Sequence, residues 1–79
     1  MMIEELDVVV LTVDIAEHNL AAGDVGTVVL VHGDHEGYEV EFMTLVGETI
    51  AVVTLHTHQV RAIAADEIAH VRRLESASA

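Results

Sequence analysis

The sequence contains no cysteine, which excludes a disulfide framework, a thiolate metal site and a thiol nucleophile. It also has no apolar run of the roughly 18 residues that a membrane span requires, because acids interrupt every apolar stretch. Residues 1–7 hold three acids and no base, which is not the pattern of a signal peptide. We therefore expect a cytoplasmic protein, and a chain of 79 residues predicts a single small domain.

Basic residues are scarce. The chain has 14 acids against three arginines, Arg61, Arg72 and Arg73, and residues 1–60 contain no lysine or arginine. With a formal net charge of −11, the protein should repel phosphate backbones and anionic lipids, so we expect no binding to nucleic acid or to membranes. The charge favours a basic protein partner or a cation. It can also serve only to keep a hydrophobic domain soluble.

Alternation of period two, typical of β-strands, dominates the rest of the sequence. It predicts five short strands, at residues 7–13, 25–32, 38–43, 48–55 and 60–63. The connections between them are too short for crossovers, so we expect an antiparallel meander that closes into a small barrel. The fold class is thus mainly β, and residues 1–63 form the predicted domain.

The predicted connections carry their own signals. Residues 15–22 predict a loop with one helical turn, in which Asn19 can adopt a left-handed conformation. Gly26, inside a predicted strand, suggests a bulge or a tight bend. Residues 56–59 predict a 3₁₀ turn before the last strand.

The C-terminal tail, residues 64–79, has a different pattern. Asp66 is a candidate N-cap, and Ile68, Val71 and Leu74 are spaced three apart, which favours a short helix. The segment can also be interpreted as alternating, so a sixth strand remains open. We expect residues 75–79 to be frayed.

Several blocks of the sequence resemble the small bacterial domain-of-unknown-function family 4926. They include Leu-Asp-Val-Val at 6–9, Gly-Asp-Val-Gly-Thr-Val-Val at 23–29, Tyr-Glu-Val-Glu-Phe at 38–42 and Ala-Val-Val-Thr-Leu at 51–55, with Gly47 and Gln-Val-Arg at 59–61. The resemblance covers about residues 6–63. It implies an SH3-like barrel, similar in outline to the C-terminal barrel of the nitrile hydratase β subunit. It implies no catalytic residues, and it points to toxin-type proteins as gene neighbours.

One departure from the family pattern bears on function. The second hairpin carries Leu45 and Val46 where the family usually has polar residues, and an exposed apolar pair at a hairpin tip often marks a contact. We therefore expect a non-enzymatic protein-interaction module without a cofactor, antitoxin-like or immunity-like, that binds a more basic protein. The predicted contact surface consists of Asp34, Glu36, Glu39, Glu41, Leu45 and Val46.

Three other interpretations are open. His56 and His58 could chelate a metal together with His32 or His35, as in a metal-handling accessory protein, although solvated histidines are the simpler alternative. Glu39 and Glu41, about 7 Å apart on a strand, have a separation that suits a glycosidase, but the solvent face of an amphipathic strand explains them better. Pairing through an open barrel edge and the tail would give a homo-oligomer.

The two aromatic residues, Tyr38 and Phe42, fall on the predicted inward face of one strand, so we expect them in the core. A chain without an exposed aromatic stripe is not expected to bind Pro-rich peptides as SH3 domains do.

Overall fold

Three long strands form the centre of the fold. The computed structural model describes residues 2–74, and in it β2 runs over Val25–His32, β3 over Gly37–Met43 and β4 over Thr49–His56. The strands pair antiparallel in a meander, with Val40 of β3 opposite Val28 on one side and Val53 on the other. The bounds agree with the alternation in the sequence to within one residue.

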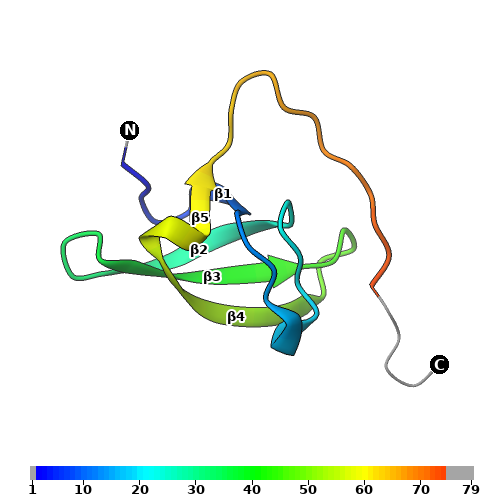
Figure 1. The fold of residues 1–79 in the computed structure, drawn as a ribbon, viewed down its shortest axis with the longest axis horizontal. Helices are drawn as coiled ribbons and strands as arrows, with labels where there is room; N and C mark the ends of the chain where they lie inside the picture. The colour runs from blue at the N-terminus through cyan, green and yellow to red at the C-terminus, as the bar shows by residue number, and fades with distance from the viewer. Residues whose placement is uncertain (1, 75–79) are drawn as a thin grey trace.

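Two short strands complete the sheet. β1 (Val8–Leu11) pairs with β2, and β5 (Val60–Ala62) pairs with β1, so that the strand order is β4-β3-β2-β1-β5. Before β5 the chain makes the predicted 3₁₀ turn, η2 (Thr57–Gln59), which returns it from β4 to β1. Figure 1 shows β1 and β5 crossing over the layer of β2, β3 and β4. The arrangement confirms the predicted five-stranded, antiparallel SH3-like barrel.

The core comes from the inward positions of these strands. Tyr38, Val40 and Phe42 of β3 are 5%, 0% and 2% exposed, which confirms that both aromatic residues are core. The cluster around them is entirely apolar and includes Val9, Leu11, Ile15, Leu20, Val28, Val53, Leu55 and Val60. The hydrophobic effect is therefore the main stabilising term of this small domain.

The loop between β1 and β2 is tied to the core at both ends. It contains the predicted helical turn, the 3₁₀ segment η1 (Ala16–His18), which ends at Asn19 with φ 61° and ψ 29°. This is the left-handed conformation expected of the asparagine. A bridge joins Ile15 to Leu20, whose side chains are both buried. Within residues 2–74 no helix is long and apolar enough to cross a membrane.

Gly26 allows β2 to approach β3 closely. A Cβ atom at this position would lie 2.6 Å from Cγ1 of Val40, 2.8 Å from Cε1 of Phe42 and 3.0 Å from the backbone oxygen of Glu41. The pairing irregularity that the glycine suggested lies further along, between Val28 and Leu30. Gly26 is thus a point of close packing, and the shift in register follows it.

The tail corrects one prediction, because residues 64–74 form neither the short helix nor the sixth strand. The guanidinium of Arg61 donates to both carboxylate oxygens of Glu67, at 2.9 and 2.5 Å, and the Ala64 backbone N–H donates to the same carboxylate at 2.6 Å. The Arg61 hydrogen bond lowers the pKa of Glu67 to about 2. Residues 75–79, predicted to be frayed, lie outside the described residues.

A second ion pair holds the far end of the tail. Arg72 donates from Nε and Nη2 to the two carboxylate oxygens of Asp24, at 2.7 and 2.5 Å, and from Nη2 to the backbone oxygen of Asn19 at 3.1 Å. Between the two ion pairs, Ile68 and Val71 are 93% and 68% exposed. A nine-residue helix is marginal in water without tertiary packing, and no barrel surface buries the apolar face it would have had.

Replacing Gly26 tests the close approach of the strands. We expect Gly26→Ala to destabilise the protein by about 1–3 kcal/mol, because the added methyl group overlaps Val40 and Phe42 in the core. Urea denaturation measures the change. Thr27→Ala, at the next position of β2, is the control for strand propensity. A cost for Gly26→Ala no larger than that for Thr27→Ala would contradict the packing argument.

Candidate functional site

The outward face of β2, β3 and β4 carries the acidic residues that the sequence singled out. Because Tyr38, Val40 and Phe42 point into the core, Glu39 and Glu41 point to solvent. Their cross-strand neighbours on β4 are Thr54 and Val52. The alternation that builds the core therefore also builds a stripe of carboxylates along β3.

Hydrogen bonds fix the position of Glu39. Its Oε2 accepts from Nε2 of His32 at 2.6 Å and from the hydroxyl of Thr54 at 2.5 Å. The hydrogen bond from His32, and then that from Thr54, hold the pKa of Glu39 below its usual value of 4.5. Glu39 is therefore an oriented anion at neutral pH, held between its two neighbouring strands.

Glu41 is held in a similar way and completes the acidic stripe. The hydroxyl of Thr49 donates to its Oε2 at 2.6 Å. Two exposed apolar side chains flank the stripe, Leu30 opposite Glu39 on β2 and Val52 opposite Glu41 on β4, at 44% and 51% exposure. We call Leu30, Glu39, Glu41 and Val52 the outer sheet face. It combines fixed negative charge with apolar area.

The other predicted acids lie in the turn that joins β2 to β3. The side chain of Asp34 is fully exposed, and Glu36 is also exposed. His35 adopts φ 62° in this turn, and its Nε2 lies 3.3 Å from the carboxylate of Glu4. Asp34 and Glu36 thus extend the acidic surface beyond one end of β3.

Leu45 and Val46 lie in the turn at the other end of β3. They are 89% and 86% exposed, as expected of residues at a hairpin tip. The turn is closed by the Thr44 backbone N–H, which donates to the Glu48 oxygen at 2.8 Å. The seven residues of β3 separate this pair from Asp34 and Glu36 by roughly 20 Å. The structure thus brings Glu39 and Glu41 together but places the loop acids and the apolar pair at opposite ends.

The outer sheet face contains two residues that the sequence interpretation missed, Leu30 and Val52. Their exposure could not be deduced from alternation alone, because β2 is apolar on both faces and its register shifts between Val28 and Leu30. Val52 lies in an apolar run, Ala-Val-Val-Thr-Leu, in which the outward positions are not marked by charge.

His56 and His58 are exposed and close together. Their rings are stacked, with centroids 5.7 Å apart and planes 4° apart, so the two side chains lie side by side. His32 and His35, the proposed third ligands, contact Glu39 and Glu4 instead. Within residues 2–74 there is no group of three histidine or acidic residues that could hold a metal ion. The stacked pair alone supplies two ring nitrogens.

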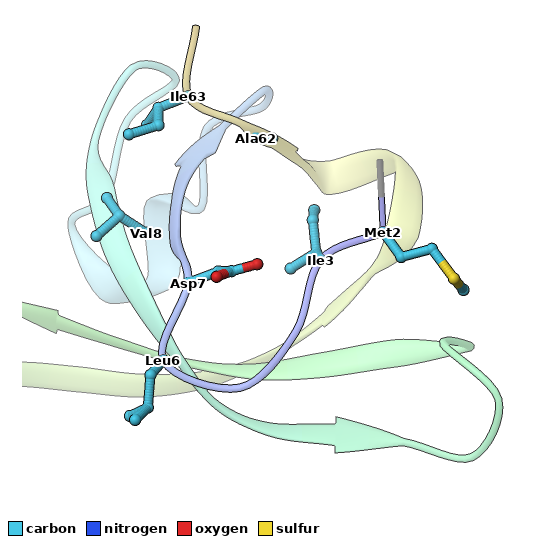
Figure 2. A pocket seen from close by; sticks show the side chains of 7 residues that line it. All are labelled: Met2, Ile3, Leu6, Asp7, Val8, Ala62 and Ile63. Atoms are coloured by element: carbon cyan, nitrogen blue, oxygen red, sulfur yellow. The ribbon is translucent and has the colours of Figure 1, made fainter. Parts of the chain in front are cut away.

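A small pocket lies beside the N-terminal segment. It has a volume of about 250 Å³ and is lined by Met2, Ile3, Leu6, Asp7, Val8, Ala62 and Ile63. Figure 2 shows Asp7 and Ile3 pointing toward one another, whereas Met2 and Leu6 point away. The Asp7 carboxylate accepts the Glu4 backbone N–H at 2.9 Å and so closes a local turn. Small-molecule sites are usually larger and carry several convergent polar groups, which this pocket does not offer.

Comparison with known proteins places most of the chain in one family. The family model described as Domain of unknown function (DUF4926) matches residues 5–62, a span that contains all five strands. No curated protein and no solved structure gives a significant match to the chain.

The pH dependence of stability tests the contacts of Glu39. Because its pKa is lowered in the folded protein, its contribution is fully present above the unfolded value near 4.5 and is lost as the pH falls through the folded value. We expect Glu39→Gln to cost up to about 1 kcal/mol at pH 7 and less than that at pH 3. Urea titrations at both pH values measure this. Glu36→Gln is the control, and an equal cost of Glu39→Gln at both pH values would contradict the argument.

Proposed function

The chain belongs to the DUF4926 family, whose function is unknown, and we propose that it is a non-enzymatic interaction module that binds a more basic protein. The observation that carries this proposal is the outer sheet face. Its two carboxylates are fixed by hydrogen bonds from His32, Thr49 and Thr54 before any partner arrives. Preorganised charges lose little conformational entropy on binding, which favours affinity.

The placement of the arginines also supports a basic partner. Arg61 and Arg72, two of the three basic residues, are paired with Glu67 and Asp24, away from the outer sheet face. Within residues 2–74 the carboxylates of Glu39 and Glu41 accept hydrogen bonds from His32, Thr49 and Thr54, none of which is a lysine or an arginine. With a net charge of −11, the protein would steer a cationic surface toward itself and speed association at low salt.

The apolar flanks would supply the part of the affinity that salt does not screen. Leu30 and Val52 lie directly beside the carboxylates, so a partner that pairs with Glu39 and Glu41 also covers them. Asp34 and Glu36 would extend the charged contact, and Leu45 and Val46 are candidate anchors at the far hairpin. Inhibition of a basic toxin-type protein, in an antitoxin-like or immunity-like role, is the specific form of the proposal.

Partner capture from the native host lysate tests whether the negative charge of the outer sheet face contributes to partner binding. We expect the tagged protein to retain one dominant basic partner at low salt and to release it at high salt, as read by mass spectrometry. Glu39→Lys with Glu41→Lys should weaken capture at least about tenfold, since like charges now face each other. The matched control, Glu5→Lys with Glu17→Lys, changes the net charge equally at other exposed sites. Equal losses in both double variants would show that only overall charge matters, and an empty capture would overturn the proposal.

The apolar flanks give a separate prediction. Leu30→Ser with Val52→Ser should weaken the captured complex by about tenfold through lost apolar area, with little change in salt dependence. Leu45→Ser with Val46→Ser tests the hairpin anchors in the same titration. Both double variants should keep the circular dichroism spectrum of the folded domain, because all four side chains are exposed. Unchanged affinity in both variants would limit the contact to charge.

A further inference from the structure

A large apolar groove lies between the barrel and the tail, apart from the outer sheet face. Its volume is about 860 Å³, and its walls come from β1, β2, the β3–β4 hairpin and residues 63–74. Figure 1 shows the tail leaving β5, arching away from the sheet and passing down beside the barrel. None of the residues of the outer sheet face lines this groove.

The groove gathers most of the exposed apolar side chains of the protein. Within residues 2–74, 14 large apolar residues are exposed, and eight of them line the groove: Val8, Val25, Met43, Leu45, Ile63, Ile68, Val71 and Leu74. Leu45, predicted from the sequence as a partner anchor, is therefore also part of this groove. Exposed apolar side chains gathered in one groove often mark a surface that another molecule covers.

The charges around the groove indicate which kind of molecule covers it. All three arginines line it, and of the 14 acids only Asp24 and Glu67 are among its described lining residues. Both of these acids are already paired, with Arg72 and Arg61. A basic protein gains nothing from this surface. Two copies of a chain with charge −11 can meet at this surface without bringing unpaired carboxylates of its described lining together.

The backbone of the tail supports the same conclusion. Residues 68–71 belong to neither a helix nor a strand and form no backbone–backbone hydrogen bond within the described part of the chain. Their N–H and C=O groups are therefore available to another strand. Antiparallel pairing of this segment with its own copy creates a two-fold interface that would cover Ile68 and Val71 of both chains.

We propose that the groove and the tail beside it form the interface between two copies of this chain. The two tails would pair antiparallel about a two-fold axis. Each tail would then cover the edge of the apolar groove of the other copy. The ion pairs Arg61–Glu67 and Arg72–Asp24 hold each tail in place for this contact. Partner binding on the outer sheet face is a separate event, because the two surfaces share no residue.

Sedimentation equilibrium of the full chain tests the proposal. Over a concentration series from low micromolar upward we expect a species of twice the single-chain mass of 8.5 kDa. Ile68→Asp with Val71→Asp should raise the dimer dissociation constant at least tenfold, because it places four acids in the two-fold contact. The matched control, Val29→Asp with Val52→Asp, adds the same charge at exposed positions outside the groove and should leave the dimer intact.

A disulfide test locates the axis and does not depend on affinity. The chain has no cysteine, and antiparallel pairing of residues 68–71 places Ile68 of one copy opposite Val71 of the other. Ile68→Cys with Val71→Cys should therefore give a disulfide-linked dimer under mild oxidation, whereas Val29→Cys with Val52→Cys should not. A monomer at every concentration, or a dimer that survives the Ile68→Asp, Val71→Asp change, would overturn the proposal. Glu39→Lys with Glu41→Lys should leave the dimer unchanged, so failure of the partner proposal and failure of this one are distinguishable.

Discussion

The alternation of β3 is the constraint on which the rest of this structure depends. Tyr38, Val40 and Phe42 supply both aromatic residues and the centre of the core, and the positions between them are carboxylates. A slip of one residue in register would bury Glu39 and Glu41 and expose the core, so the strand has one acceptable pairing. Gly26 enforces that pairing from β2, since only a residue without a side chain fits against Val40 and Phe42. Stability and surface chemistry are thus set by the same seven residues.

Alternation also explains how much of the fold could be predicted. Strands bounded by turn signals, such as β2 after Gly23-Asp24 and β4 after Gly47, were predicted to within one residue. The left-handed Asn19 and the 3₁₀ turn before β5 followed from local preferences as well. These features depend on neighbours in the sequence. The register shift between Val28 and Leu30 depends instead on how β2 and β3 pair, so local sequence does not predict it. This shift places Leu30 beside Glu39.

In the tail, tertiary contacts override the local preference of the sequence for a helix. Asp66 and the spacing of Ile68, Val71 and Leu74 are valid helix signals, but a helix of this length needs a surface for its apolar side. The carboxylate of Glu67, which would have lain in the first turn, instead binds the guanidinium of Arg61 and the Ala64 N–H. Arg72 reaches Asp24, 48 residues away in the sequence. No sequence pattern within the tail could predict a contact with a residue so far away in the sequence.

The length of β3 explains why the residues predicted for partner binding do not form one compact patch. Glu39 and Glu41 were found because charge alternates with core residues, whereas Asp34 and Val46 were grouped with them although β3 holds them at opposite ends. Arg61 and Arg72 organise the tail through their ion pairs with Glu67 and Asp24. By confining its few cations to the tail and groove, the chain leaves the outer sheet face acidic and the groove nearly neutral. The domain thus has an acidic sheet face and a nearly neutral apolar groove with no residue in common, which suits the two separate contacts that we propose.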